Sequence, residues 1–497
     1  MIRIDLEGNP GPKESSMRNL NSRHCRIAAT SRIQRALCVA VLLFPLAVQA
    51  AEPPPGPTAV RLKVDPTSAR NSIADSFIGL GYETSAVARE KFFSAENTHL
   101  VQLYRTLSPN GLVRIGGIIG DHTRFEPAGV PAAHDMNGTT VINKAVLADL
   151  GGFLRATGWT ALWTLNLGAG SKEEAVQEAL AVRSALGDRL HSFEIGNEVD
   201  LLKRFDSYAS YHTTYLDYKA AIRAAIPDAV FSGPDSAIKK EWTVAFAKTE
   251  SKDMKLLLHH YYRGGAKSPQ ATIQTLLGPH PEWDSTLRTL EETCKAEHIA
   301  FRINEVNSFS GGGKPDVSDT FASALWCLDF MFRVAAHGGD GVNMETDVNQ
   351  LGFVSHYSPI YRDSDGQLTA RPEYYGMLAF ALAGKGKLLD VAASPTSIDM
   401  SAYATKRDDG PIWVTVINKD LTQTADIELA MPQGYSTAEC YRLIAPSAQS
   451  KTDVTLAGTQ VGVAGDWNPG QAEAVAVSEN TATFSLRAAS AALVRLR

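Results

Sequence analysis

The chain has 497 residues, of which 44% are hydrophobic and 21% are charged. This profile excludes a disordered, collagen-like or disulfide-scaffold protein, and the length favours one large domain with a smaller companion. The net charge is −6, and beyond the first fifty residues 41 Lys and Arg stand against 51 Asp and Glu. This acidic balance argues against a nucleic-acid-binding protein.

The first fifty residues have the pattern of a signal peptide. Five arginines between residues 18 and 35 lead into an apolar run at 36–48, and Val48 and Ala50 supply the small residues of a cleavage site. We therefore expect residues 1–50 to be removed by cleavage near Ala50, and the mature protein to be periplasmic or secreted. The apolar run contains Pro45 and is too short to cross a hydrocarbon layer of ~30 Å. No later stretch is longer, so no integral membrane segment is expected in the mature chain.

Residues 51–58 form a proline-rich linker, and 59–75 begin with an alternating strand that we expect to join a C-terminal β domain. Between 76 and 387, short apolar runs alternate with amphipathic helical stretches. Expected strands are 77–82, 112–116, 161–167, 192–196, 230–233, 255–260, 300–304 and 341–344. Expected helices are 97–107, 143–157, 171–186, 207–226, 242–249, 281–297, 319–337 and 372–383, the third opening with a capping box at 171–174.

Eight such alternations are typical of an α/β protein with a (β/α)₈ barrel. No glycine-rich dinucleotide fingerprint follows the first strand, which argues against a doubly wound sheet and a nucleotide cofactor. Residues 388–497 alternate with period two between turn residues and predict an antiparallel β-sandwich. Its expected strands are 412–417, 425–430, 439–443, 473–477 and 481–486.

Two glutamates follow strands of the predicted barrel. Glu198 comes after the fourth strand and Glu305 ends the seventh, and these strands face each other across the barrel mouth, where active sites form. The two carboxyl groups can therefore flank a single bond. This is the arrangement for glycoside hydrolysis, in which one carboxylic acid protonates the leaving oxygen and the other carboxylate attacks the sugar or activates water.

The sixth strand carries two histidines and two tyrosines. Alternation places His259 and Tyr261 on one face and His260 and Tyr262 on the other. Because neighbouring histidines point in opposite directions and no acidic ligand follows at a fixed spacing, we expect no metal site. The cysteines beyond residue 50 also fit no zinc motif, so no cofactor is expected. We expect His260 to be satisfied in the barrel wall.

Three segments carry a resemblance to a known family: Phe193-Glu-Ile-Gly-Asn-Glu198, His259-His-Tyr-Tyr262, and 304–322 with its Gly311-Gly-Gly313 loop. Together they resemble glycoside hydrolase family 79, the β-glucuronidase and heparanase family of the retaining barrel clan. The resemblance covers the barrel and, less specifically, the β domain. It implies that the protein cleaves β-linked glucuronic acid through a glycosyl-enzyme intermediate.

By this resemblance, Glu198 is the general acid/base and Glu305 the nucleophile. Other positions that match the family are expected to bind or orient the sugar and its carboxylate, and they are Asn197, Tyr261 (orienting Glu305), His259, Glu83, Gly311 and Gly312. Ser310 stands where the family has a tyrosine, so its shorter hydroxyl or Lys314 would complete the carboxylate contact, and Tyr357, Tyr361 or Phe309 are candidates to rebuild the wall. Asp121 is a further candidate contact to the sugar that the resemblance does not supply. We expect Arg114 to be a buried strut behind the acid's loop.

Two other functions remain open at this point. A heparanase-like endo-β-glucuronidase would act on heparan sulfate or another glycosaminoglycan, although a polyanionic chain favours a basic cleft and this chain is acidic. A non-catalytic carbohydrate-binding protein would use the same barrel without turnover. The expected partner in each case is a β-glucuronide or a saccharide derived from a glycosaminoglycan.

Overall fold

The computed structural model describes residues 58–127, 130–134, 138–349, 354–407 and 410–497. The predicted signal peptide at 1–50 and the linker up to residue 57 lie outside the described residues. Among the residues that are described, no helix has both the length and the apolar character needed to cross a bilayer.

Eight parallel strands form the barrel, and their order in the sheet follows the chain, with the last strand paired to the first. An isolated bridge between Phe193 and Phe231 and a hydrogen bond from Ser232 N to Phe193 O, 2.8 Å, close the remaining gap. The structure therefore confirms the predicted barrel. Its strands are β3 (Gly79–Glu83), β4 (Leu112–Gly116), β8 (Thr160–Leu165), β9 (Leu190–Ile195), β10 (Gly233–Ser236), β11 (Leu257–Tyr262), β12 (Phe301–Asn307) and β13 (Gly341–Glu345).

The fifth strand begins later than expected. Residues 230–232 approach β9 only through the closing bridge, whereas Gly233 pairs with Leu257 of β11. Regular pairing therefore starts at Gly233, and β10 places Asp235 inside the barrel, where it is fully buried.

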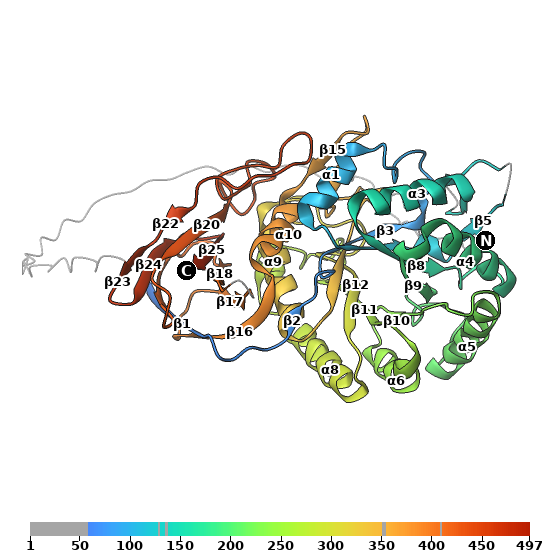
Figure 1. Ribbon diagram of the computed structural model, residues 1–497, viewed down its shortest axis with the longest axis horizontal. Helices are drawn as coiled ribbons and strands as arrows, with labels where there is room; N and C mark the ends of the chain where they lie inside the picture. Colours follow the sequence, from blue (N-terminus) through green and yellow to red (C-terminus); the bar gives the residue numbers. More distant parts are fainter. Residues whose placement is uncertain (1–57, 128–129, 135–137, 350–353, 408–409) are drawn as a thin grey trace, which may run out of the picture. The chain divides into compact units, whose positions relative to one another are not determined.

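Helices surround the barrel strands (Figure 1). The predicted capping box is present, because Ser171 accepts from the Glu174 N–H and Glu174 accepts from the Ser171 N–H. The longer helices are α1 (Thr98–Leu107), α3 (Lys144–Thr157), α4 (Lys172–Leu186), α5 (Tyr208–Ala225), α6 (Lys240–Glu250), α8 (Pro281–Glu297), α9 (Phe321–Ala336) and α10 (Pro372–Ala383). Shorter elements between barrel strands are α2 (Gly117–Gly120), α7 (Ile273–Leu277), β5 (Thr123–Phe125), β6 (Ala133–His134) and β7 (Thr140–Ile142), while β14 (Ile360–Arg362) and β15 (Leu368–Ala370) follow the last barrel strand.

The C-terminal residues form a β domain around its own hydrophobic core, as the alternating pattern predicted. β16 runs through both halves of its sheet, since residues 387–389 pair with β17 and residues 390–393 pair with β1. The strands are β16 (Gly386–Ala393), β17 (Met400–Lys406), β18 (Ile412–Asn418), β19 (Ala425–Ala430), β20 (Ala438–Ile444), β21 (Thr455–Leu456), β22 (Glu473–Ala474), β23 (Ala476–Ser478), β24 (Thr481–Leu486) and β25 (Ser490–Leu496), with β2 (Ser72–Ile73) paired to β16.

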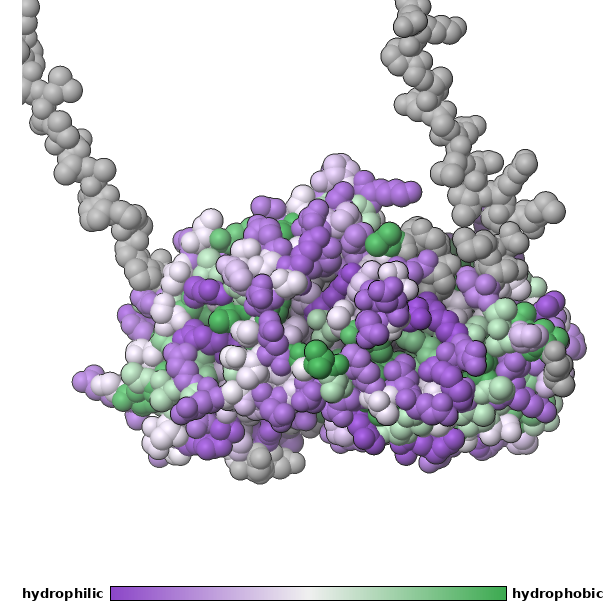
Figure 2. All heavy atoms as spheres, turned by 90° about the horizontal axis from the view of Figure 1, so that it is seen from above, coloured by the Kyte–Doolittle hydropathy of each residue, from purple (hydrophilic) through white to green (hydrophobic). Residues whose placement is uncertain are grey.

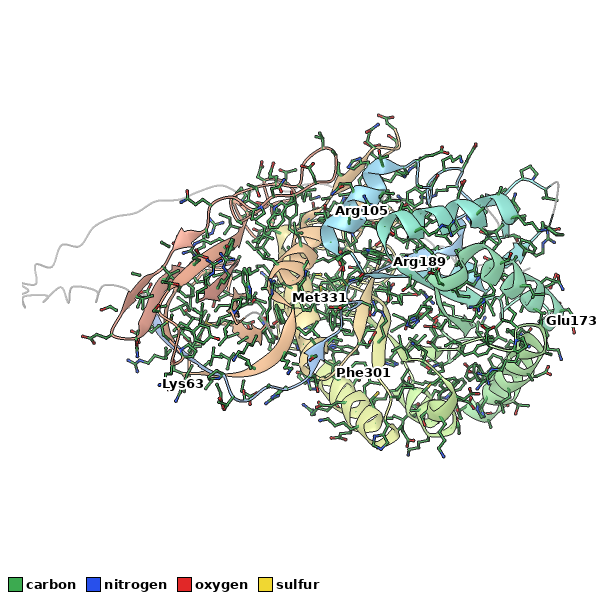
Figure 3. The ribbon with its side chains drawn as sticks, in the orientation of Figure 1. Lys63, Arg105, Glu173, Arg189, Phe301 and Met331 are labelled. Atoms are coloured by element: carbon green, nitrogen blue, oxygen red, sulfur yellow. The ribbon has the colours of Figure 1, made fainter. Side chains whose placement is uncertain are left out.

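The N-terminal strand β1 (Thr58–Asp65) lies between β16 and β19 of the β domain, antiparallel to the first and parallel to the second. Its side chains alternate, because Val60, Leu62 and Val64 are buried while Lys63 is exposed (Figure 3). The chain therefore enters through the β domain, builds the barrel, and returns to complete the sheet (Figure 1).

The barrel and the β domain also meet through Asp329 of α9. Its carboxylate accepts from the Tyr403 hydroxyl at 2.7 Å and from Lys419 Nζ at 3.2 Å, and both of these residues come from the β domain. Asp329 is buried. A buried carboxylate needs such partners, so this contact fixes α9 against the sheet.

Candidate active site

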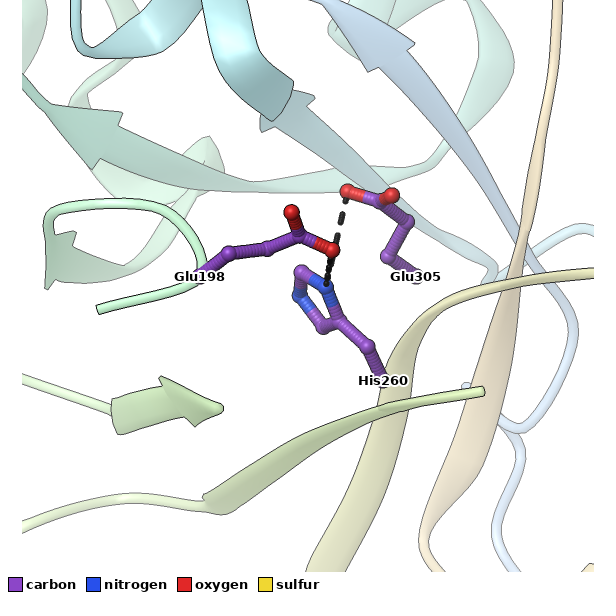
Figure 4. Close-up of side chains that lie close together, drawn as sticks. All are labelled: Glu198, His260 and Glu305. Atoms are coloured by element: carbon purple, nitrogen blue, oxygen red, sulfur yellow. Dashed lines mark hydrogen bonds and ion pairs between the residues drawn. The ribbon is translucent and has the colours of Figure 1, made fainter. Parts of the chain in front are cut away.

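Glu198 and Glu305 meet in a cavity of about 420 Å³ at the carboxyl ends of the barrel strands. Glu198 lies in the turn after β9, and Glu305 lies in β12. One carboxylate oxygen of each residue and one ring nitrogen of His260 all lie within 4.8 Å of one another (Figure 4). This separation suits the ~5–5.5 Å spacing of retaining glycosidases rather than the ~6.5–9.5 Å spacing of inverting ones.

Glu305 is held from two sides. Arg114 Nη1 donates to Oε2 at 2.6 Å, and the hydroxyl of Tyr262 donates to Oε1 at 2.9 Å. Only 11% of the Glu305 side chain is exposed, so the carboxylate has little freedom to turn. These two hydrogen bonds fix the orientation of the carboxylate toward the cavity.

Arg114 is the centre of a buried polar network. Its Nε donates to Glu194 at 2.8 Å, and its Nη2 donates to Asn197 and Asp235, each at 2.7 Å. The guanidinium is completely buried. Burial opposes ionisation of Asp235, but Arg114 and His260 outweigh it and lower the Asp235 pKa to about 2. Arg114 is therefore a buried strut, and it ties Glu305 to the segment preceding Glu198.

Glu198 has the properties of a proton donor. Burial raises its pKa, the hydrogen bond from His260 opposes that rise, and the charge of Glu305 adds to it. His260 Nδ1 lies 3.4 Å from Glu198 Oε1. Glu198 also has a φ of 44°, a left-handed conformation that is costly for a residue with a Cβ and that recurs at functional sites. Burial therefore favours the protonated form of Glu198, which is the form a proton donor needs.

On β11, the tyrosine that contacts Glu305 is Tyr262 and not the expected Tyr261. The hydroxyl of Tyr261 is bonded to His280 Nδ1 at 2.9 Å, and His259 Nδ1 is bonded to Thr243 at 3.0 Å. Tyr261 borders the cavity with part of its ring, but the hydroxyl that orients Glu305 belongs to Tyr262.

His260 likewise faces the carboxylates rather than the barrel wall. Its Nε2 donates to Asp235 Oδ1 at 2.7 Å. The start of this strand offers no clue to the face, because Leu257, Leu258 and the preceding Leu256 are all apolar. In addition, the register against β12 shifts between His259 and His260, which resets the alternation at this point.

Two further carboxyl groups border the cavity. Glu83 was expected there; its Oε2 accepts from the Ile119 N–H at 2.8 Å, and burial followed by the charge of Glu305 raises its pKa to about 8. Glu345, at the end of β13, was not anticipated. Neither of its oxygens has a hydrogen-bond partner among the described residues, and burial together with Glu305 and Glu83 raises its pKa well above 4.5. The position of Glu345 in the sequence, directly after the predicted strand 341–344, would have indicated it as a candidate.

Asp121 does not border the cavity, contrary to expectation. Its Oδ1 accepts from the backbone N–H groups of Leu167 and Gly168 at 3.0 and 2.9 Å, and its Oδ2 accepts from Asn197 N at 3.2 Å. Burial raises the pKa of Asp121 to about 7. Asp121 therefore positions the loop after β8 and the backbone of Asn197. Asn197 is buried beside Glu198, and its contact with a sugar hydroxyl remains a prediction.

The glycine loop after β12 forms one wall of the cavity. Ser310, Gly311 and Gly312 border it, and both glycines have φ values above 80° that side chains disfavour. Neither glycine N–H has an acceptor among the described residues, so both are available to an anion.

Lys314 and Tyr361, which were expected in this wall, do not border the cavity. The Tyr361 ring lies 3.5 Å from the Arg371 guanidinium instead. Tyr357 takes the place in the wall, and its ring centroid lies 6.2 Å from that of Tyr262. Because Lys314 and Tyr361 do not border the cavity, this wall consists of the glycine loop, Ser310 and Tyr357.

Glu198, His260 and Glu305 also have the spacing of metal ligands. Burial opposes the charged form of His260, but Asp235 and Glu305 outweigh it and raise the His260 pKa well above 6.5. A protonated imidazole has no lone pair to offer a metal ion. The arrangement therefore suits proton transfer and nucleophilic attack better than metal binding.

Comparisons with known proteins show similarity to glycoside hydrolases. A family model described as the C-terminal β domain of glycosyl hydrolase family 79 matches residues 398–493. A β-glucuronidase of Aspergillus niger is 26% identical over 286 residues, covering 51% of this chain and 52% of the relative. A β-glucuronidase of Neurospora crassa is 25% identical over 376 residues, covering 65% and 66%. The chain thus spans about half to two thirds of these relatives.

Solved structures share the fold. A 4-O-α-L-rhamnosyl-β-D-glucuronidase from Fusarium oxysporum superposes with a TM-score of 0.71 at 18% identity, covering 87% of this chain and 99% of that one. A family 51 α-L-arabinofuranosidase from Bifidobacterium longum gives 0.67 at 14% identity, covering 88% and 99%.

The barrel, the β domain and the paired glutamates together have the arrangement that retaining glycoside hydrolases use. The matched β domain and the curated relatives support a relationship of this chain to glycoside hydrolase family 79.

Proposed function

We propose that the protein is a retaining β-glucuronidase. The observation that carries the proposal is the close approach of Glu198 and Glu305 in one cavity, with opposite chemical environments. Burial raises the pKa of Glu198, while Arg114 and Tyr262 donate to Glu305. The glucuronic acid specificity draws support from the relatives named β-glucuronidase.

The reaction would proceed by double displacement. Glu198 gives its proton to the glycosidic oxygen as Glu305 attacks the anomeric carbon, so the bond to the aglycone breaks and a glycosyl-enzyme ester forms. Glu198, now ionised, takes a proton from water as the water oxygen attacks the same carbon and releases Glu305. Net retention of configuration follows from two inversions.

The uronate carboxylate would bind at the glycine loop. Gly311 and Gly312 border the cavity and their N–H groups lack acceptors among the described residues. Ser310 and Tyr357 border the same wall and supply hydroxyl groups. Glu83 and Glu345 lie elsewhere on the cavity surface, where protonated or partly protonated carboxyl groups can exchange hydrogen bonds with sugar hydroxyls.

The direct test is the Glu305→Gln variant, assayed for hydrolysis of an aryl β-glucuronide. Glu292→Gln, at an exposed position, is the matched control variant. The amide at position 305 keeps the size of the side chain but cannot form the ester, so turnover should be lost while the folded state and ligand binding remain. Proton NMR of the wild-type reaction should show the β anomer as the first product. Appreciable hydrolysis by Glu305→Gln, or initial release of the α anomer, would overturn the proposal.

Endo-cleavage of heparan sulfate is the second candidate, favoured by a relative named heparanase-like protein 1 from Arabidopsis thaliana, 22% identical over 358 residues. Against it, no Lys or Arg is among the described residues that border the cavity. Product sizes from heparan sulfate separate the two activities. A non-catalytic sugar-binding protein would show no activity at any pH, whereas an acid/base pair gives a bell-shaped profile.

We also propose export of the protein with removal of residues 1–50. The basic residues and apolar run that precede Ala50 support it. N-terminal sequencing of the protein recovered from the periplasm or the medium should begin at Ala51, and recovery of the intact chain from the cytoplasm alone would contradict it.

A further inference from the structure

Exposed apolar side chains gather at the mouth of the cavity. Nine large hydrophobic side chains are well exposed among the described residues, and three of these border the cavity: Ile118 at 50%, Leu201 at 47% and Ile238 at 71%. On the face in Figure 2, hydrophobic residues form small patches between hydrophilic ones. Single exposed hydrophobic residues are ordinary, but three around one polar cavity mark a binding surface.

Two of the three belong to the Glu198 side of the cavity. The N–H of Leu201 donates to the carbonyl of Glu198 at 2.7 Å, which closes the turn that carries the acid. The N–H of Ile238 donates to Asp200 Oδ2 at 2.9 Å, and the same carboxylate accepts from Ala237 and Lys239. Asp200 is buried. Leu201 and Ile238 are therefore fixed to the segment that holds Glu198.

The charge around the cavity disfavours binding of an anionic group on the far side of Glu198. Four glutamates and no Lys or Arg are among the described residues that border it. The neighbouring cations are engaged elsewhere, because Lys239 Nζ lies 4.7 Å from the ring centroid of Trp242 and the Arg204 guanidinium lies 5.0 Å from that of Phe205. Exposed apolar side chains beside unbalanced carboxyl groups suit a neutral, apolar group.

We propose that Leu201, Ile238 and Ile118 form a binding site for an apolar aglycone, so that the natural substrates are glucuronides of hydrophobic alcohols or phenols. The proposal rests on the proposed function: if Glu198 protonates the glycosidic oxygen, the aglycone must lie directly beyond Glu198, where Leu201 and Ile238 are. Sugar hydroxyls then face the glutamates inside the cavity, and the aglycone covers apolar surface that is otherwise exposed to water.

Alkyl β-glucuronides test this inference without changing leaving-group acidity. Hexyl and methyl β-D-glucuronide release alcohols of similar pKa, so a difference in kcat/KM reports binding of the chain. We expect kcat/KM to be roughly tenfold higher for the hexyl compound. Leu201→Ser and Ile238→Ser should each lower the hexyl-to-methyl ratio severalfold. Leu216→Ser is the matched control, because Leu216 on α5 is 44% exposed but does not border the cavity.

Calorimetry with Glu305→Gln gives a readout that does not depend on turnover. Hexyl β-D-glucuronide should bind more tightly than the methyl compound, and adding Leu201→Ser should remove the difference. The inference would be overturned if the hexyl-to-methyl ratio of kcat/KM were the same in the wild type and in both serine variants. A preference for sulfated oligosaccharides over the hexyl compound would overturn it as well. Either result would leave glucuronide hydrolysis intact. Loss of all glucuronide hydrolysis in the wild type would instead overturn the proposed function, and calorimetry would still decide the apolar site.

Discussion

The hydroxyl of Tyr262 donates a hydrogen bond to Glu305 Oε1 at 2.9 Å. The hydroxyl of Tyr261, one residue earlier on the same strand, is instead hydrogen-bonded to His280 Nδ1, also at 2.9 Å. Two adjacent tyrosines therefore have separable roles, and only one of them contacts the proposed nucleophile.

Tyr262→Phe should lower kcat by roughly 10- to 100-fold, because a hydrogen bond to a charged group contributes about 1.5–3 kcal/mol. Tyr261→Phe should have a much smaller effect, since it removes a hydrogen bond outside the pair of carboxylates. Steady-state kinetics on an aryl β-glucuronide compare the two variants. Equal losses in both would show that the hydroxyl of Tyr262 has no particular role at Glu305.

His260→Gln should move the basic limb of the pH profile to higher pH. The hydrogen bond and charge of His260 lower the pKa of Glu198 against the rise caused by burial, so their removal lets that pKa rise further. Glu198 must be protonated to donate, and activity is therefore kept to a higher pH. The kcat/KM profile of the free enzyme reports this pKa.

His259→Gln is the control for that shift, because His259 is bonded to Thr243 and not to the carboxylates. Its basic limb should stay within experimental error of the wild type. If the basic limb of His260→Gln moved to lower pH instead, His260 would raise the pKa of Glu198 and not lower it.

Arg114→Lys should lower the free energy of unfolding by about 3 kcal/mol, the scale for breaking a buried ion pair. A single ammonium cannot reach all four partners of the guanidinium, so buried carboxylates lose their compensation. Denaturant unfolding measures the change. Arg61→Lys, at an exposed pair with Glu428, should change stability by less than about 0.5 kcal/mol, and similar losses in both would contradict the network's importance.

Glu178→Gln should gain stability relative to the wild type as pH rises. Burial raises the Glu178 pKa from 4.5 to about 8, so the folded state retains a proton that the unfolded state releases, and wild-type stability falls between those values. The amide can still accept the Trp163 Nε1–H that Glu178 accepts at 2.8 Å. Urea unfolding at pH 5 and pH 8 should show a larger gain at pH 8, and a gain independent of pH would be inconsistent with this ionisation.

Local pattern accounts for most of the fold. The strand at 112–116 was placed to the residue, and the last two barrel strands began within one residue of their expected positions. Side-chain alternation and helical periodicity are properties of neighbouring residues, so they can be recognised without a structure. The fifth strand was misplaced because 230–232 look like a strand locally but pair only through the bridge that closes the barrel.

The sequence by itself determined the barrel, the β domain and the two glutamates at strand ends, because residue type, spacing and chain order carry that information. Only the tertiary structure decided which face of β11 turns inward, that Asp121 binds backbone rather than borders the cavity, and that Glu345 joins Glu83 beside Glu305. These outcomes depend on register shifts and on contacts between segments tens to hundreds of residues apart. Such contacts form when the barrel closes, and no local pattern encodes them.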